Sequence, residues 1–80
     1  MTPVDERARE NLRRALLARR MEIVTLGRRA MGMDPGHSGI RMARRHLAGE
    51  TRMDLDTVDT YARILGVDPG WLAFGEGEPR

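Results

Sequence analysis

Cysteine is absent from the 80-residue chain, so neither disulfide bonds nor thiolate metal sites can add to its stability. A chain of this length buries only about 60–65% of the surface that its unfolded form exposes, which limits the core. Its stability must therefore come from close packing of helices or from self-association. The lack of cysteine also fits the reducing conditions of a cytoplasm.

Long apolar runs are missing too. No segment approaches the about 20 apolar residues that a membrane-spanning helix needs. The first residues, Met-Thr-Pro-Val-Asp-Glu, lack the basic start and the apolar stretch of a secretory signal. We therefore expect a soluble, cytoplasmic protein that has no membrane partner.

Lysine is the third absence, since all 14 basic residues are arginine. The planar guanidinium group suits phosphate and guanine because it donates two parallel hydrogen bonds. A GC-rich coding bias explains the choice of arginine equally well, but it does not explain how the charges are distributed. Residues 1–52 carry a net charge of +6 and residues 53–80 a net charge of −4. This asymmetry indicates that the first part faces a polyanion.

Apolar residues recur at helical spacing along the chain, and no stretch alternates as a strand does. We therefore predict an all-α fold, a compact five-helix bundle in a single domain that spans residues 1–80. The predicted helices cover about residues 3–20, 25–32, a segment that ends near 48, 54–65 and 69–74. Their predicted starts are Thr2 with Pro3, Thr25, Asp54, and Asp68 with Pro69, and glycines 49 and 66 follow two of their ends.

The predicted core consists of the apolar residues at i, i+3 and i+4 positions of these helices. It comprises Ala8, Leu12, Ala15, Leu16, Leu26, Ala30, Met33, Ile40, Ala43, Leu47, Leu55, Val58, Ala62 and Leu65. The methionines near helix junctions, Met21, Met31, Met33 and Met53, are expected to fill the core as well. Gly27 is expected to weaken the second helix by about 1 kcal/mol relative to alanine.

The second and third helices, about residues 25–48, have the pattern of a helix-turn-helix: a short helix, a glycine-containing turn, and a helix with one basic side. Small or polar residues at the start of the third helix, Gly36, Ser38 and Gly39, allow entry into a major groove. The donors expected for bases and phosphates are Arg41, Arg44 and Arg45. Met42 is expected to face a thymine methyl group, and His37 either donates to DNA or occupies the first helical turn.

Four pieces of sequence then follow in order. They are Ala-Arg-Arg-His-Leu-Ala-Gly-Glu at 43–50, Met-Asp-Leu-Asp-Thr-Val at 53–58, Tyr-Ala-Arg-Ile-Leu-Gly-Val at 61–67, and Trp-Leu at 71–72 with Gly-Glu-Gly at 75–77. In this order and spacing they resemble the lambda-repressor/Cro type of helix-turn-helix domain, the XRE family. Upstream, Leu-Gly-Arg-Arg-Ala at 26–30 is similar to the family's second helix.

The resemblance implies a sequence-specific DNA-binding transcriptional regulator, a repressor, that binds a near-palindromic site on double-stranded DNA as a homodimer. It implies that Arg41 and Arg44 read the groove, that Arg45 lies near the DNA backbone, and that Arg28 and Arg29 meet phosphates.

The chain departs from the family by about five extra residues before the turn at 49–50. These residues either lengthen the turn, so that the recognition helix starts near Ser38, or extend that helix back to Asp34. Both alternatives keep Arg41, Arg44 and Arg45 helical, but they differ on whether His37 and Ser38 reach the bases.

Two other questions stay open at this point. Trp71, Leu72 and Phe74 belong either to the core or to a dimer surface. The alternative function is a protein-interaction module of antitoxin-like or phage-encoded type on the same scaffold, with the acidic fourth helix and residues 71–74 as its contact surface.

We expect no enzyme, cofactor, metal or small-molecule ligand. The sequence has no paired carboxylates, nucleophile triad or phosphate-binding loop. His37 and His46 are separated along the chain and have no cysteine beside them, which does not make a zinc site. His46 is expected to pack in the interior.

Overall fold

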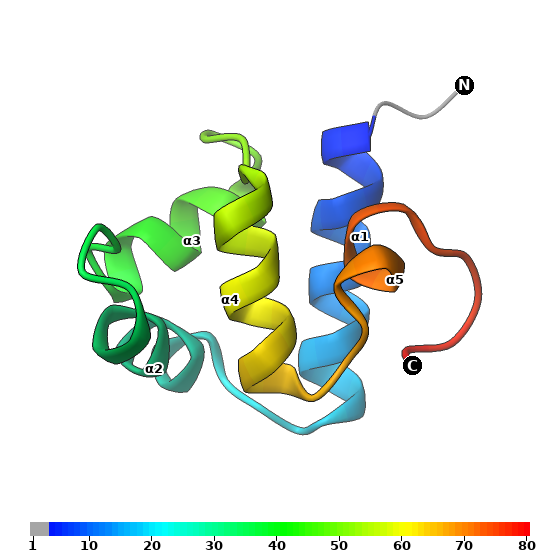
Figure 1. Cartoon of the computed structure of the whole chain (residues 1–80), viewed down its shortest axis with the longest axis horizontal. Coiled ribbons are helices and arrows are strands. Elements are labelled where there is room, and N and C mark those ends of the chain that lie inside the picture. Colours follow the sequence, from blue (N-terminus) through cyan, green and yellow to red (C-terminus); the bar gives the residue numbers. More distant parts are fainter. Residues whose placement is uncertain (1–3) are drawn as a thin grey trace.

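Five α-helices make up the computed structural model, which describes residues 4–80. They are α1 (Val4–Ala18), α2 (Ile23–Met33), α3 (Ile40–Ala48), α4 (Leu55–Leu65) and α5 (Pro69–Phe74). No strand forms within this range, and the all-α prediction is confirmed. In Figure 1, α1 and α4 lie side by side, with α2 and α3 on one side of them and α5 against α1 on the other. The predicted cap at Thr2 and first helical residue Pro3 lie outside the described residues.

The last two helices begin as predicted. The side-chain oxygen of Asp54 accepts a hydrogen bond from the backbone N–H three residues later at 2.8 Å, and Asp68 does the same at 3.1 Å. Each bond satisfies one of the N–H groups that a helix start leaves free. α3 and α4 end at Gly49 and Gly66, whose φ values of 79° and 68° are the left-handed conformation that glycine adopts at low cost.

α1 is shorter at its end than the predicted limit at residue 20. Arg20 takes a φ of 52°, and the next N–H, that of Met21, donates back to the carbonyl of Leu16 at 2.9 Å. This is the hydrogen bond with which helices close on a left-handed residue. An arginine occupies a position that usually holds glycine, so composition alone did not reveal the end of α1.

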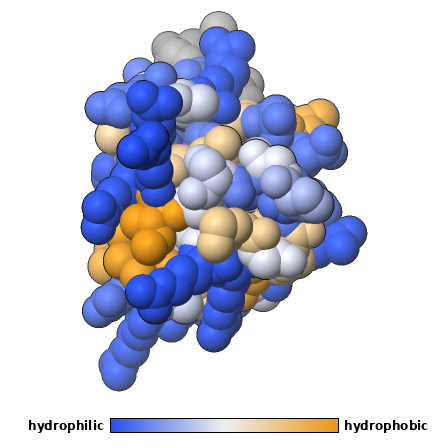
Figure 2. Space-filling view, turned by 90° about the vertical axis from the view of Figure 1, so that its left-hand side faces the viewer, coloured by the Kyte–Doolittle hydropathy of each residue, from blue (hydrophilic) through white to orange (hydrophobic). Residues whose placement is uncertain are grey.

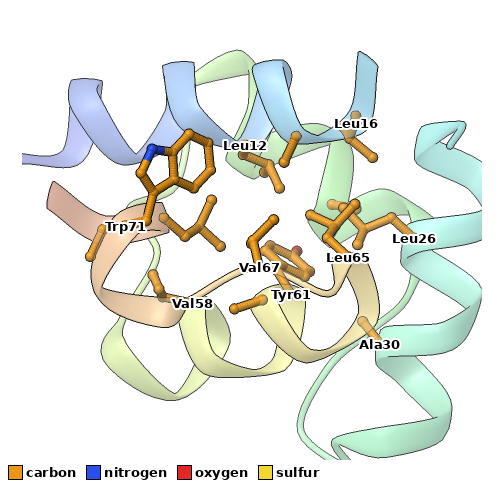
Figure 3. Packing of buried hydrophobic residues seen from close by; sticks show 14 residues of the cluster. Leu12, Leu16, Leu26, Ala30, Val58, Tyr61, Leu65, Val67 and Trp71 are labelled. Atoms are coloured by element: carbon orange, nitrogen blue, oxygen red, sulfur yellow. The ribbon is translucent and has the colours of Figure 1, made fainter. Parts of the chain in front are cut away.

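The predicted apolar stripe of α1 lies in the interior, facing α4 (Figure 3). All its members, Ala8, Leu12, Ala15 and Leu16, are buried, as are Leu26, Ala30, Ala43, Val58, Ala62 and Leu65 of the other helices. Tyr61 is fully buried at the centre of this core. The periodicity of the sequence therefore identified most of the interior.

Three residues predicted for the core lie at the surface. Leu55, Met31 and Met33 are 74%, 55% and 49% exposed. Leu55 is the first residue of α4, one turn before the buried part of that helix. α2 turns Leu26 and Ala30 inward, so its last residues end outside the core. Of the other methionines predicted for the core, Met21 and Met53 do pack against it.

The question about residues 71–74 is settled by burial. Trp71 and Leu72 are 4% and 0% exposed and belong to the core, so their assignment to a dimer interface is wrong. Phe74 is 60% exposed and remains available at the surface.

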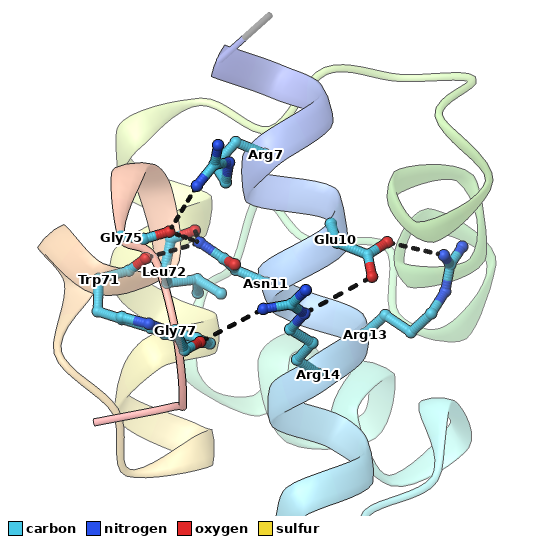
Figure 4. Close-up of polar contacts among 9 residues, drawn as sticks. All are labelled: Arg7, Glu10, Asn11, Arg13, Arg14, Trp71, Leu72, Gly75 and Gly77. Atoms are coloured by element: carbon cyan, nitrogen blue, oxygen red, sulfur yellow. Dashed lines mark hydrogen bonds and ion pairs between the residues drawn. The ribbon is translucent and has the colours of Figure 1, made fainter. Parts of the chain in front are cut away.

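α1 holds the end of α5 through polar side chains (Figure 4). The buried amide of Asn11 donates to three carbonyl oxygens at 2.9–3.3 Å, and Arg7 and Arg14 donate to carbonyls at 3.3 and 3.4 Å. The acceptors are Trp71, Leu72, Gly75 and Gly77. Carbonyls at a helix end lack partners within the helix, and these side chains supply them.

Arg9 of α1 and Arg19, the residue directly after α1, hold the ends of α3 and α4. Arg9 donates to the carbonyl of Ala48 at 3.4 Å, and the Nε of Arg19 donates to the carbonyl of Leu65 at 2.9 Å. Part of the positive charge of residues 1–52 thus serves the fold. These guanidinium groups keep their charge, but their donors are engaged by carbonyl oxygens of the fold.

Candidate nucleic-acid interface

The pair predicted as a helix-turn-helix, α2 and α3, approaches most closely at two glycines. A Cβ atom on Gly27 would lie 2.6 Å from the Cα of Ile40, and Gly39, the residue before α3, has a φ of 88°. Gly27 is needed because the two backbones touch, and Gly39 because other residues rarely adopt this conformation. The expected weak point of α2 is thus the contact that sets its crossing with α3.

Residues 34–39 form the turn between the two helices. The extra residues therefore lengthen the turn, α3 begins at Ile40, and the alternative that extends the helix back to Asp34 is wrong. Asp34 instead organises the turn: its side chain accepts the N–H of Gly36 at 2.9 Å, and its carbonyl accepts the N–H of His37 at 3.0 Å. Ser38 is exposed in this turn, just outside the helix.

His37 does not face solvent. It is 3% exposed, and its ring nitrogens bond the N–H of Gly39 at 2.9 Å and the hydroxyl of Tyr61 at 2.8 Å. His46, also 3% exposed as expected for an interior residue, bonds the same hydroxyl at 2.6 Å. The prediction that His37 contacts DNA is therefore wrong. Local patterns did not reveal this cluster because Tyr61 comes from a different helix, far along the chain.

Burial shifts the pKa of all three groups away from the charged form. It lowers the pKa of His37 and of His46, and His37 lowers that of His46 further, while Asp34 and Asp54 act in the opposite direction. Burial also raises the pKa of the Tyr61 hydroxyl. The cluster is thus uncharged at neutral pH.

The solvent side of α3 is basic, as predicted. Arg41, Arg44 and Arg45 are helical and exposed, whereas Ala43 and His46 face the interior. Figure 2 views this side of the molecule, where long hydrophilic side chains project around a small apolar area. A shallow groove runs along the helix between Ile40, Arg41, Arg44, Arg45, Ala48 and Glu50.

The arginines of this side differ in their partners. Arg45 pairs with Glu50 at 4.0 Å, which reduces its charge toward another molecule. Within residues 4–80, no ion pair or side-chain hydrogen bond engages the exposed arginines of α2 or the other two of α3, which are Arg28, Arg29, Arg41 and Arg44. These four guanidinium groups are available to an external anion.

Met42 faces a different groove. It is half-buried, and it lines a depression between the turn and α4 whose charged residues include Asp34, Asp54, Asp56 and Asp59. Met42 therefore lies in a different groove from Arg41 and Arg44, and its expected contact with a thymine methyl group stays a prediction.

Comparison with known proteins finds no match: no family model, no curated protein and no solved structure matches the chain. Membership of the XRE family stays a prediction that depends on the motifs at 43–77. Among residues 4–80, none of the helices has the length and hydrophobicity needed to cross a bilayer.

Proposed function

We propose that this protein is a sequence-specific DNA-binding transcriptional regulator that inserts α3 into a major groove. The observation that carries the proposal is the set of four exposed guanidinium groups on α2 and α3, to which no ion pair forms within residues 4–80. A major groove about 12 Å wide admits one helix, and arginine is the commonest reader of guanine there. At Gly27 the backbone of α2 contacts the start of α3 directly, so α2 supports the proposed recognition helix.

The roles of the arginines follow from their positions. Arg41 and Arg44 lie on the exposed side of α3 and are proposed to read base edges, whereas Arg28 and Arg29 on α2 are proposed to bind phosphates. Arg45, which shares its charge with Glu50, contributes less. Regulation is proposed to act by occupancy, as a repressor does, with two copies on half-sites about 34 Å apart.

The test begins with selection of bound duplexes from a random pool, followed by titrations on the selected and on a scrambled duplex. We expect Arg41→Ala to lower affinity for the selected duplex by about 1–3 kcal/mol and to leave the scrambled one nearly unchanged. Arg28→Ala should weaken both alike, because phosphates carry no sequence information. Arg63→Ala is the control, since Arg63 is exposed but pairs with Asp59 on α4. Absence of binding to any duplex at low salt would contradict the proposal.

A protein-interaction module is the second candidate, and one observation favours it. The exposed side chains of Leu55 and Phe74 line one groove together with Val58 and Ala73. Sedimentation of the Leu55→Ser and Phe74→Ser variants, with the equally exposed Leu17→Ser as control, tests whether a second copy covers this groove. Loss of self-association in these two variants, with DNA binding retained by single copies, favours the regulator. Self-association without DNA binding favours the interaction module.

A further inference from the structure

A buried chain of hydrogen bonds ties the turn before α3 to α3 itself and to α4. It runs from the N–H of Gly39 to Nδ1 of His37 at 2.9 Å, and from Nε2 of His37 to the Tyr61 hydroxyl at 2.8 Å. The same hydroxyl lies 2.6 Å from Nδ1 of His46. Both imidazole rings meet the Tyr61 ring nearly edge-on, with centroids 5.5 and 5.6 Å away. Three segments of the fold thus converge on one hydroxyl group.

The backbone N–H of Gly39 fixes the direction of both hydrogen bonds at His37, and the need of the Tyr61 proton for an acceptor selects the tautomer of His46. A backbone N–H only donates, so Nδ1 of His37 must accept from Gly39 and the ring proton must be on Nε2. Nε2 of His37 then donates to the oxygen of Tyr61, and the phenolic proton has an acceptor in this chain only if Nδ1 of His46 is unprotonated. The arrangement in which every donor of the chain has an acceptor thus has two neutral imidazoles with unprotonated Nδ1 atoms.

A proton added to either ring breaks the chain. On His37 it would occupy Nδ1, where it opposes the N–H of Gly39. On His46 it would also occupy Nδ1, and the buried hydroxyl of Tyr61 would then have no acceptor for its own proton. Buried donors without acceptors are costly, so each protonation disfavours this arrangement.

We propose that the chain from Gly39 through His37 and Tyr61 to His46 positions the start of α3 only while both imidazoles are neutral, so that acidification releases the turn and weakens DNA binding. The inference rests on the proposed function, because the element that is positioned is the proposed recognition helix. Gly39 directly precedes α3, and Arg41 follows in its first turn.

Charged groups surround the chain on several sides. They come from the turn (Asp34), from α1 (Asp5 and Arg9), from the loop before α4 (Arg52), and from the cap and first half of α4 (Asp54, Asp56 and Asp59). Asp34 and Asp54 favour protonation of His37 and His46, but desolvation outweighs them and lowers the pKa of both rings.

The sign of the pH dependence follows. Unfolded histidine titrates near pH 6.5. Because the folded pKa values lie lower, the full stabilisation is present above pH 6.5 and is lost as the pH falls below it. The unfolding constant should rise by up to about tenfold per pH unit for each histidine, and up to about 100-fold for both. The carboxyl group of Asp54, which faces His46, stays ionised in this window, since its pKa lies below its ordinary value of 3.8.

The sign of the change in DNA affinity with pH distinguishes release of the turn from a simple increase in positive charge. Acidification makes a protein more positive, which by itself strengthens its attraction to phosphates. Release of the turn predicts the opposite, a loss of affinity between pH 7 and pH 5. Dividing the measured affinity by the fraction of folded protein gives a corrected affinity. If the chain only stabilises the fold, the corrected affinity does not change with pH; if it also positions α3, the corrected affinity falls with acid.

Three measurements on the whole chain from pH 7.5 to 5 test the inference: urea unfolding, ¹⁵N spectra of the imidazole tautomers, and titration of the duplex selected from the random pool. The variants are His37→Asn and His46→Asn, whose side-chain oxygens can replace Nδ1 as acceptors but do not titrate. The logarithm of the unfolding constant, plotted against pH, has a slope to which each histidine contributes. We expect each single variant to halve this slope and the double variant to show almost none. Its corrected DNA affinity should no longer fall with acid.

The tautomer spectra keep the inference testable even if the variants fail to fold. Protonated Nδ1 atoms at pH 7.5, or titration of both rings at their ordinary pKa, would overturn it. So would a corrected DNA affinity that does not fall between pH 7 and pH 5. Absence of DNA binding at every pH would overturn the proposed function instead, and the spectra and unfolding curves would still report on the chain itself.

Discussion

Gly27 and Gly32 both lie in α2 but differ in what a methyl group would meet. At Gly27 an added Cβ would lie 2.6 Å from the backbone of α3, whereas at Gly32 it would meet nothing within 4 Å beyond its chain neighbours and the backbone of its own helix. We expect Gly27→Ala to lower the free energy of unfolding by about 1–3 kcal/mol, because two backbones must separate. Gly32→Ala should raise it by up to about 1 kcal/mol through helix propensity. Urea denaturation of both variants checks this, and equal effects would exclude a close crossing at Gly27.

Arg20 shows why a residue's type can conceal its conformation. Its φ of 52° is the conformation found at Gly49 and Gly66, yet its sequence context resembles the arginine-rich helix before it. Glycine marks a helix end because it adopts this conformation at low cost, but other residues are held there when the following hydrogen bonds require it. The ends of α3 and α4 were predictable, and the end of α1 was not.

At the scale of elements, Asn11 joins α1 to the end of α5. Its side chain is 1% exposed and its amide nitrogen donates to carbonyl oxygens, so a carboxylate at this position would place an anionic oxygen against those carbonyls. We expect Asn11→Asp to destabilise the protein by about 3 kcal/mol or more near pH 7. The loss should be smaller at pH 4, because burial raises the pKa of the new carboxyl group and its protonated form can donate.

Unfolding curves of Asn11→Asp and of Asn11→Ala at the two pH values provide the measurement. The alanine variant removes the hydrogen bonds without adding a charge, so its effect should depend little on pH. A pH-independent loss in both variants would mean that the amide does not face the carbonyls of α5.

The sequence predicted those elements whose signals are local. Asp54 and Asp68 cap helices through N–H groups three residues away, and the stripe around Leu12 follows the helical period. Contacts between segments that are far apart in the sequence could not be predicted from it. His37 resembles a solvent-facing residue of a basic helix until Tyr61 of α4 is brought beside it, and the same holds for Asn11 and α5.

At the scale of the whole molecule, the basic charge divides between the fold and the proposed interface. Residues 1–52 contain 12 arginines, but five of them, in α1 or directly after it, bind carbonyls or glutamates, namely Arg7, Arg9, Arg13, Arg14 and Arg19. The arginines assigned to DNA are four, on α2 and α3. The charge asymmetry of the sequence indicated a polyanion partner but did not distinguish these two groups.

This division predicts the salt dependence of DNA binding. Each neutralised phosphate contributes about 0.9 to the slope of log K against log salt concentration, so four arginines give a slope of about −3 to −4 per protomer. Titrations of a duplex at several salt concentrations measure it. Arg19→Ala should leave the slope unchanged while lowering stability, and Arg29→Ala should reduce its magnitude by about 0.9. A slope near −10 would show that the arginines of α1 also bind DNA.

The two glycines on either side of α3, Gly39 and Gly49, also allow the exposed side chains of this helix to be replaced without changing the fold. Both have positive φ, so the chain turns sharply on either side of a short rod whose inward residues are Ala43 and His46. The four solvent-facing positions, 41, 44, 45 and 48, contribute little to the interior. A library that randomises only these four side chains should therefore keep one scaffold while sampling many binding preferences.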